Sequence, residues 1–183
     1  MQEGNKLEET FIEVLQDDEY DLLFHQVMTK YGRDVLVLAY SYVKNKDIAE
    51  DLTQEIFVKC YQSLCTFNHG SKLKTWLWRI AINHCKDYLK SWHNRYVEVA
   101  DAHYLSSRPS QEDVEGQVIK RDKQAGLIEA VLQLPVPYRE IIYLHYYEDL
   151  SLKEIEYITG ININTVKTRL RRAKDLLKTQ LEE

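Results

Sequence analysis

The sequence predicts an all-α fold: two small helical domains joined by a flexible linker. Apolar residues recur with a period near 3.6 over most of the 183 residues. Only six glycines and three prolines occur, and these are the residues that most often interrupt helices. Residues 93–115 lose the helical period and gather serine, proline and acidic residues, as a linker between folded units does.

These patterns divide the chain into four segments. We expect an acidic N-terminal extension over 1–19, a first helical domain over 20–92, the linker over 93–115 and a second helical domain over 116–183. The predicted helices of the first domain are 20–43, 47–66 and 73–92, and those of the second are 116–133, 136–147, 151–159 and 162–180.

Charge is distributed unevenly along the chain, whose formal net charge is −5. Residues 1–21 carry one lysine and eight acidic residues, net −7, whereas residues 22–90 carry ten cations and six acidic residues, net +4. An acidic protein with two local basic surfaces should bind bare DNA weakly, because affinity depends on how many cations reach the phosphates together. We therefore expect a protein partner to present it to DNA.

The sequence also indicates where the protein acts and what it lacks. It has no run of about 18 apolar residues and no basic segment followed by an apolar one at its start, so we expect a cytoplasmic protein. Its three cysteines lack Cys-x-x-Cys spacing, which argues against a disulfide framework and a zinc ribbon. Cys60, Cys85 and His84 lie in helical patterns beside apolar neighbours, so we predict structural roles for them and no metal or cofactor.

In the first domain, the helix predicted over 47–66 has an acidic start. Asp47 and Glu50 have the spacing of a capping box. Ile48, Leu52, Ile56 and Tyr61 lie near one face of the helix, with acidic residues and Gln54 turned away. Acidic residues near a helix start are favoured by the helix dipole alone, so this patch by itself is generic.

The next helix is predicted to combine an apolar stripe with a polar, aromatic face. The stripe is Leu77, Ile80, Ala81, His84 and Tyr88, and the polar face is Trp76, Arg79, Asn83, Lys86 and Lys90. Cations that follow phosphates and rings that stack on bases suit single-stranded nucleic acid. Trp76 and Trp78, each taken alone, are more typical of core anchors.

The second domain ends in a predicted helix-turn-helix. Ser151 and Glu154 form a capping box, Gly160 ends the first helix and Asn162 caps the second. The second helix carries Val166, Leu170, Ala173 and Leu177 on one side and Lys167, Thr168, Arg171 and Arg172 on the other. One side can pack while the other meets DNA; the alternative is a solvated charged face.

Four blocks of the sequence form a recognisable set: residues 47–57 (DIAEDLTQEIF), 74–83 (KTWLWRIAIN), 134–143 (LPVPYREIIY) and the helix-turn-helix. In this order they resemble bacterial sigma factors of the extracytoplasmic-function (ECF) subgroup of the sigma-70 family. The resemblance covers about residues 20–92 and 120–180. It implies a transcription initiation factor that binds core RNA polymerase, directs it to particular promoters and opens the DNA.

The resemblance also implies roles for individual residues. The stretch that would dock on the clamp helices of the polymerase β′ subunit, beside further contacts with β, holds Asp47, Glu50, Asp51, Gln54 and Glu55. A flipped base of the promoter −10 element would enter a pocket in the loop that holds Phe67, Asn68, His69 and Lys74, and the strand beside it would lie on Trp76, Arg79 and Asn83. The −35 element would be read in the major groove by Lys167, Thr168, Arg171 and Arg172.

Two further features bear on this resemblance. A linker of 23 residues spans roughly 75 Å when fully extended, and two turns of duplex are about 70 Å long, so it could bridge two promoter elements. The helix-turn-helix departs from the family pattern at Glu156, where a small alanine is usual, and at Thr159, where an aliphatic residue is usual. These two residues put the close packing of its helices in question.

By the same resemblance, an anti-sigma factor, often membrane-anchored, would hold the protein inactive. One alternative is a helix-turn-helix regulator without affinity for polymerase, which would not need the Trp76–Lys90 face. Another is an enzyme. The sequence offers no phosphate-binding glycine loop, no Gly-x-Ser-x-Gly and no His-Glu-x-x-His, so we predict that the protein is not an enzyme.

Overall fold

The computed structural model describes residues 17–64, 67, 70–100 and 122–182. Within them the chain is helical, without strands, which confirms the predicted all-α class. The elements are α1 (Asp17–Val43), α2 (Lys46–Leu64), α3 (Leu73–Ala100), α4 (Asp122–Gln133), α5 (Val136–Ile142), the π-helix η1 (Tyr143–Tyr147), α6 (Leu152–Thr159) and α7 (Ile163–Glu182). None of these helices has the length and apolar character needed to cross a membrane.

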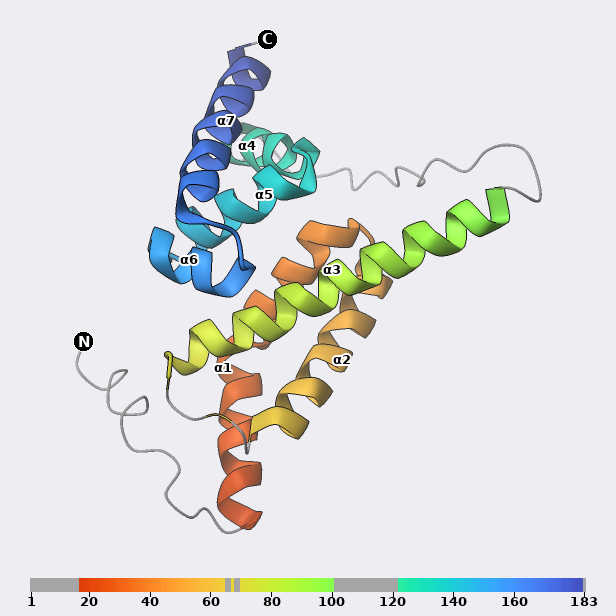
Figure 1. The fold of residues 1–183 in the computed structure, drawn as a ribbon, viewed down its shortest axis with the longest axis vertical. Coiled ribbons are helices and arrows are strands. Elements are labelled where there is room, and N and C mark those ends of the chain that lie inside the picture. The colour runs from red at the N-terminus through yellow and green to blue at the C-terminus, as the bar shows by residue number, and fades with distance from the viewer. Residues whose placement is uncertain (1–16, 65–66, 68–69, 101–121, 183) are drawn as a thin grey trace.

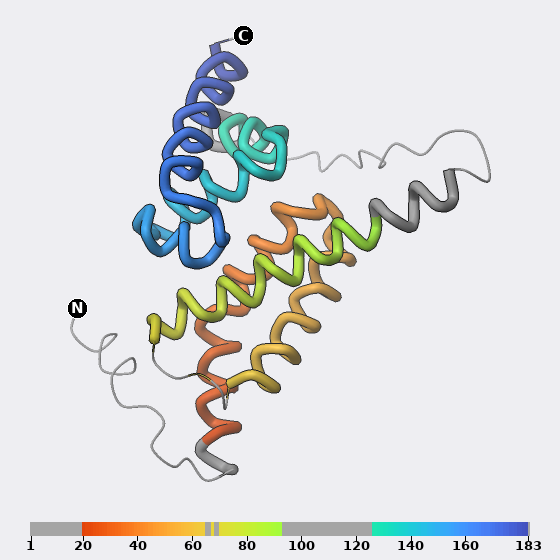
Figure 2. Tube along the Cα trace, viewed as in Figure 1, coloured from red at the N-terminus to blue at the C-terminus, as the bar shows by residue number. Residues whose placement is uncertain are grey.

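Helices α1 to α3 form the first group (Figure 1). The chain reverses direction between α1 and α2, and α3 crosses both, as Figure 2 shows. Lys44 takes a left-handed conformation with φ of 52° at the reversal, and the side chain of Asn45 accepts a hydrogen bond from the Ile48 N–H at 3.0 Å. Asn45 therefore caps α2, and the predicted capping box of Asp47 and Glu50 is wrong, because the helix begins one residue before Asp47.

Helices α4 to α7 form the second group, in which α5 and α4 pack against α7. Pro135 is the N-cap residue of α5, and Pro137 lies in its first turn, where the missing N–H costs no helical hydrogen bond. The predicted helix 136–147 is not uniformly α-helical, since residues Tyr143–Tyr147 widen into a π-helix. The Glu148 N–H closes this segment on the Tyr143 carbonyl at 3.1 Å. Such wide turns often occur where a helix is adapted to a contact or a function.

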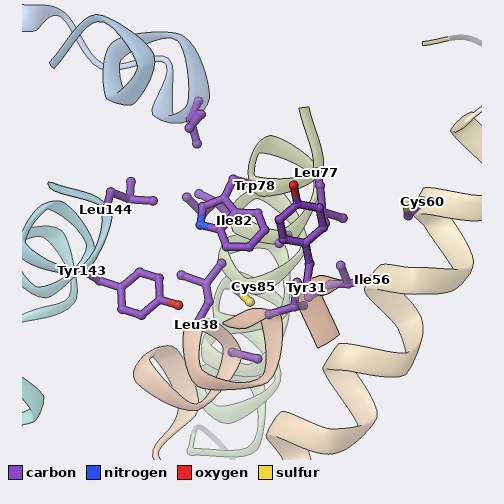
Figure 3. Close-up of a cluster of buried hydrophobic side chains, with 14 of the residues drawn as sticks. Tyr31, Leu38, Ile56, Cys60, Leu77, Trp78, Ile82, Cys85, Tyr143 and Leu144 are labelled. Atoms are coloured by element: carbon purple, nitrogen blue, oxygen red, sulfur yellow. The ribbon is translucent and has the colours of Figure 1, made fainter. Parts of the chain in front are cut away.

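The two groups share one hydrophobic core. Trp78 and Leu77 of α3 lie in it fully buried, with Leu38 of α1. Tyr143 and Leu144 of η1 point into the same cluster, toward Leu38, Trp78 and Ile82, as Figure 3 shows. The widened turn thus places two side chains of the second group in the core of the first.

One predicted helix end needs correction. Helix α3 continues to Ala100, eight residues beyond the predicted end at residue 92, so the segment 93–115 begins as helix. Its serines, proline and acidic residues lie nearer its other end, which explains why the prediction ended the helix too early. Residues 101–115, and the predicted helix start at residue 116, lie outside the described residues, as does the N-terminal extension up to residue 16.

Candidate nucleic-acid interface

The helix-turn-helix has the local geometry that the sequence predicts. The Glu154 N–H donates to Ser151 Oγ at 3.3 Å, and the Ser151 N–H donates to Glu154 Oε2 at 2.9 Å, which completes the capping box. Gly160 ends α6 with φ of 68°, a left-handed value that glycine adopts without strain. Asn162 Oδ1 accepts the Asn164 N–H at 2.9 Å and caps α7. All three predicted signals are confirmed.

The two departures from the family pattern hold the turn together. Glu156 Oε1 accepts the Ile163 N–H at 2.8 Å, so its carboxylate satisfies a donor in the first turn of α7. Thr159 Oγ1 donates to the Ile155 carbonyl at 2.6 Å and accepts the Ile161 N–H at 3.3 Å. Apolar packing between the helices is retained, because Ile155, Ile158 and Val166 are buried.

Helix α7 presents the predicted −35 residues to solvent. Lys167, Thr168, Arg171 and Arg172 are all exposed, while Val166 and Ala173 on the opposite side are buried. Within the described part of the chain, none of the three cations in this set forms an ion pair. The basic face is thus available to a polyanion as it stands, with only solvent to displace.

The predicted −10 residues divide between an exposed surface and a buried support. Arg79 and Asn83 are exposed. Phe67 is buried, and its ring centroid lies 5.2 Å from that of the half-buried Trp76, so Phe67 packs against α3 from inside. Lys74 is held beneath this surface by Glu148 and stands over the Trp78 ring. Asn68 and His69 lie outside the described residues.

The two tryptophans of α3 have different environments. Trp78 is fully buried and meets Tyr31 edge to face, with 5.6 Å between the ring centroids. It is a core anchor, as each tryptophan taken alone suggested. Trp76 retains partial exposure on the polar side, so it can contribute a ring edge to a ligand there.

The acidic face of α2 is open to solvent. Asp47, Glu50, Asp51, Gln54 and Glu55 are all exposed. Glu55 Oε2 accepts a hydrogen bond from His84 Nε2 at 2.7 Å, and Lys59 Nζ donates to His84 Nδ1 at 2.8 Å. His84 thereby links the acidic face to α3. Tyr61, predicted near the apolar face, is 41% exposed and donates to Asp21 at 2.9 Å.

The predicted structural roles of Cys60, Cys85 and His84 can be compared with their surroundings, whereas Cys65 lies outside the described residues. Cys60 and Cys85 are buried, and burial raises the pKa of each thiol to about 12. Such thiols remain protonated at neutral pH and are poor ligands or nucleophiles. Among the described residues no group of three or more potential metal ligands is gathered.

The second domain packs on one face of α3, a contact that no sequence pattern predicted. Helix α6 packs on α3, and α5 packs on α1. Lys74 and Lys86 of α3 form ion pairs with Glu148 and Glu140, at 3.0 and 2.8 Å. One signal could have indicated this contact: Glu140 lies one turn before Leu144, on the apolar side of its helix, where a charge needs a partner.

Burial at this contact also shifts the pKa values of titratable groups around it. Burial lowers the pKa of the Lys44 ammonium, and the nearby Arg139 guanidinium adds to the shift. Arg139 itself is buried and donates to the Leu132 carbonyl at the end of α4. Burial raises the pKa of Tyr42 well above its ordinary value, with Glu140 as the next cause.

Comparison with known proteins shows which family has this architecture. Residues 27–95 match the family model "Sigma-70 region 2" and residues 125–177 match "Sigma-70, region 4". Sigma factor SigV of Bacillus subtilis is 38% identical over 84% of this chain and 88% of its own length. The ECF sigma factor SigW of the same organism is 33% identical over 87% and 89%.

Solved structures lead to the same family. The sigma factor RpoE of Bartonella quintana, in complex with the anti-sigma factor NepR, superposes with a TM-score of 0.68 at 26% identity, covering 87% of this chain and 96% of that one. CnrH, in complex with the cytosolic domain of CnrY, superposes with a TM-score of 0.62 at 20% identity and shares the fold. Together with the two family models and the curated relatives, these findings show that the chain belongs to the ECF subgroup of the sigma-70 family of RNA polymerase sigma factors.

Proposed function

We propose that this sigma factor divides its work among three surfaces. The acidic face of α2, with Asp47, Glu50, Asp51, Gln54 and Glu55, would bind the β′ clamp helices of core RNA polymerase. The loop before α3, with Phe67, Asn68, His69 and Lys74, and the α3 residues Trp76, Arg79 and Asn83 would hold the melted −10 strand. Lys167, Thr168, Arg171 and Arg172 of α7 would read the −35 element.

One observation supports the proposal: the two surfaces proposed to meet DNA lie on different helical groups, with residues 101–121 between them in the sequence. A regulator that binds only duplex DNA needs the α7 face but not the exposed Arg79 and Asn83 beside the partly exposed Trp76. We place the two functional domains at 20–92 and 116–183, and the end of α3 continues into the segment between them up to Ala100. Promoter DNA and polymerase as partners imply action in the cytoplasm.

An anti-sigma factor is the further partner that we propose. The Bartonella quintana relative was solved in complex with one. In this chain it would cover the faces of α2, α3 or α7 that bind polymerase and DNA.

Assembly with bacterial core RNA polymerase tests the function directly. The purified chain should form a stable holoenzyme, and run-off transcription on a fragmented genomic library from the source organism should start at a small set of sites that share −35 and −10 sequences. Specific duplex binding by the chain alone, without binding to core polymerase, would instead identify a DNA-binding regulator.

Two variants separate the surfaces. The Asp51→Arg variant should lose holoenzyme assembly, because it reverses a charge on the exposed acidic face. The Asn83→Ala variant should assemble normally but impair strand opening or −10 discrimination. Loss of core binding by Asn83→Ala, with an unchanged fold, would remove Asn83 from the proposed −10 surface.

A further inference from the structure

One carboxylate on the acidic face of α2 is held by a mostly buried side chain of α3. Glu55 has 61% of its side chain open to solvent, whereas the His84 side chain is only 11% exposed. His84 Nε2 donates to Glu55 Oε2 at 2.7 Å, and Lys59 Nζ donates to His84 Nδ1 at 2.8 Å. The imidazole therefore lies between an ammonium group and a carboxylate that both belong to α2.

This imidazole lies at the edge of the packing between α2 and α3. The two helices contact each other, and Figure 2 shows α3 crossing α2. Cys60 and Cys85, which follow Lys59 and His84 in the sequence, are fully buried. The helical period had placed His84 in the apolar stripe of α3. Because its ring nitrogens bond to two exposed side chains of α2, His84 connects the core to the surface of that helix.

The two partners determine which ring nitrogen of His84 carries a hydrogen. An ammonium group donates hydrogen bonds and has no acceptor, so Nδ1 must offer its lone pair to Lys59. An ionised carboxylate has only acceptors, so Nε2 must carry the hydrogen that Glu55 receives. The contacts thus select the neutral imidazole with its hydrogen on Nε2, since a hydrogen on Nδ1 would point at the Lys59 ammonium.

The same contacts keep Lys59 apart from Glu55. A glutamate four residues before a lysine is the arrangement that most readily forms a direct ion pair on a helix. Among the described residues no such pair joins Glu55 and Lys59, because the imidazole occupies both groups. Glu55 Oε1 also has no hydrogen-bond partner in the part of the chain that the structure describes. One oxygen of the carboxylate is held, while the other can accept from a partner.

Other carboxylates of the acidic face have weaker support. Glu50 lies 3.7 Å from Lys46, and their side chains are 47% and 80% exposed, so this surface pair contributes little. Asp51, one turn before Glu55, forms no ion pair with any residue that the structure describes. A side chain that is already fixed loses less conformational freedom when a partner binds it. Glu55 is therefore the better prepared of these carboxylates for a partner.

We propose that His84 is a positioning residue for the acidic face of α2. It orients the Glu55 carboxylate and withholds Lys59 from it, so that Glu55 can pair with a cation on the surface of core polymerase. His84 acts through Glu55, since its own side chain is mostly buried. The inference rests on the proposed binding of polymerase by the α2 face, and it adds a residue of α3 to that surface.

Nuclear magnetic resonance of the full chain, with histidine labelled at its ring nitrogens, tests the arrangement without polymerase. The His84 signals are identified by their loss in the His84→Gln variant. At mildly alkaline pH they should show a hydrogen on Nε2 and none on Nδ1. Lys59→Met should shift mainly the Nδ1 signal, and Glu55→Ala mainly the Nε2 signal. A hydrogen on Nδ1, or signals that neither substitution shifts, would overturn the inference.

A double-mutant cycle in polymerase binding separates positioning from general support of the fold. His84→Leu removes both hydrogen bonds but keeps an apolar side chain, and it should weaken binding to core polymerase by about 3- to 10-fold. His84→Gln, whose amide can donate to Glu55 and accept from Lys59, should bind within about twofold of the wild type. In a Glu55→Ala background, His84→Leu should have no further effect, because the carboxylate that His84 positions is absent.

His25→Leu is the matched control, since His25 is exposed on α1 and belongs to none of the proposed surfaces. It should bind polymerase as the wild type does. The inference fails if His84→Leu binds polymerase as tightly as the wild type, or if its effect persists in full in the Glu55→Ala background. The resonance measurement does not depend on the folding of His84→Leu. A wild-type chain that binds no core polymerase would instead overturn the proposed function, whatever the His84 signals show.

Discussion

Helices α3 and α7 follow the same plan but differ in what surrounds their cations. Each carries an apolar stripe opposite a face rich in lysine and arginine. The cations of α7 at Lys167, Arg171 and Arg172 are exposed to solvent, whereas Lys72, just before α3, and the cations of α3 up to residue 86 all contact the second domain. Similar sequence patterns therefore describe the α7 surface, whose cations are free to meet a ligand, and the α3 surface, whose cations already contact the second domain.

The apolar sides of the two helices differ as well. Trp78, Leu77 and Ile82 of α3 lie in a core built from both domains. Only Val166 and Ala173 of α7 are buried, and Ala173 belongs to a small separate cluster with Leu134 and Ile142. Substitutions in α3 should thus cost stability, while substitutions on α7 should cost recognition.

The largest expected effect is on α3. Trp78→Ala should lower the free energy of unfolding by about 3–5 kcal/mol, because it removes a fully buried ring that contacts Tyr31. Chemical denaturation followed by circular dichroism measures the change. The Trp76→Ala variant is the matched control, since Trp76 is only partly buried and should lose clearly less. Equal losses would show that the two tryptophans do not divide between core and surface.

The opposite behaviour is expected on α7. Arg171→Ala should leave the unfolding free energy within about 0.5 kcal/mol of wild type, because its side chain is exposed and forms no ion pair with any residue that the structure describes. It should lower use of promoters with the matching −35 element by about 10- to 100-fold, if it makes one bidentate base contact worth about 1–3 kcal/mol. Run-off transcription by reconstituted holoenzyme measures this loss.

Lys178→Ala provides the control for Arg171→Ala. Lys178 is an exposed cation nearer the end of α7 and pairs with Glu182. Its loss should change −35 use little. A similar loss for both variants would indicate a general charge effect instead of base reading by Arg171.

The sequence was a good guide where local rules decide the structure. Ser151 with Glu154, Gly160 and Asn162 each specify a backbone hydrogen-bond arrangement over a few residues, so they could be read without tertiary information. Asn45 was missed because Asp47 and Glu50 have an equally good local pattern two residues later. The end of α3 was predicted too early because residues 93–100 were grouped with the serine, proline and acidic residues that follow them in the sequence.

The contact between domains could not be predicted in the same way. Lys74, Lys86, Glu140 and Glu148 are ordinary charged residues in the sequence, and their pairing spans 54 to 74 residues of chain. The π-helix that turns Tyr143 and Leu144 into the shared core has no simple sequence signature either. Of the candidate site, the exposed faces of α2 and α7 follow from helical periodicity, while the covering of α3 requires the structure.

A smaller effect is expected for the turn before α7, where it should show whether a hydrogen bond or apolar packing fixes the orientation of that helix. Glu156→Ala removes the acceptor for the Ile163 N–H and should cost about 1 kcal/mol of stability, as loss of a helix cap does. The orientation of α7 depends on this bond, so −35 use should also fall, less than for Arg171→Ala. Denaturation and run-off transcription measure the two effects. Unchanged values for both would mean that apolar packing alone positions α7.

The smallest effect concerns the pH dependence of the capping box, which joins α6 to the α3 contact. The hydrogen bond from Ser151 lowers the pKa of Glu154, and Lys72 adds to the shift. Because the pKa in the folded state lies below the ordinary value of 4.5, the charged carboxylate contributes stability above that pH. The contribution is lost as pH falls through the lower folded value.

Glu154→Gln should therefore be less stable than wild type by about 0.5 kcal/mol at neutral pH, since the amide keeps a capping group but loses the charge near the helix start. The difference should shrink as pH falls below 4.5, where wild type becomes protonated. Denaturation series at several pH values measure it. The Lys72→Gln variant separates the two causes. If the Ser151 hydrogen bond dominates, this variant retains most of the pH dependence. If the pH dependence disappears, the ion pair between Lys72 and Glu154 at the contact between the domains is its cause.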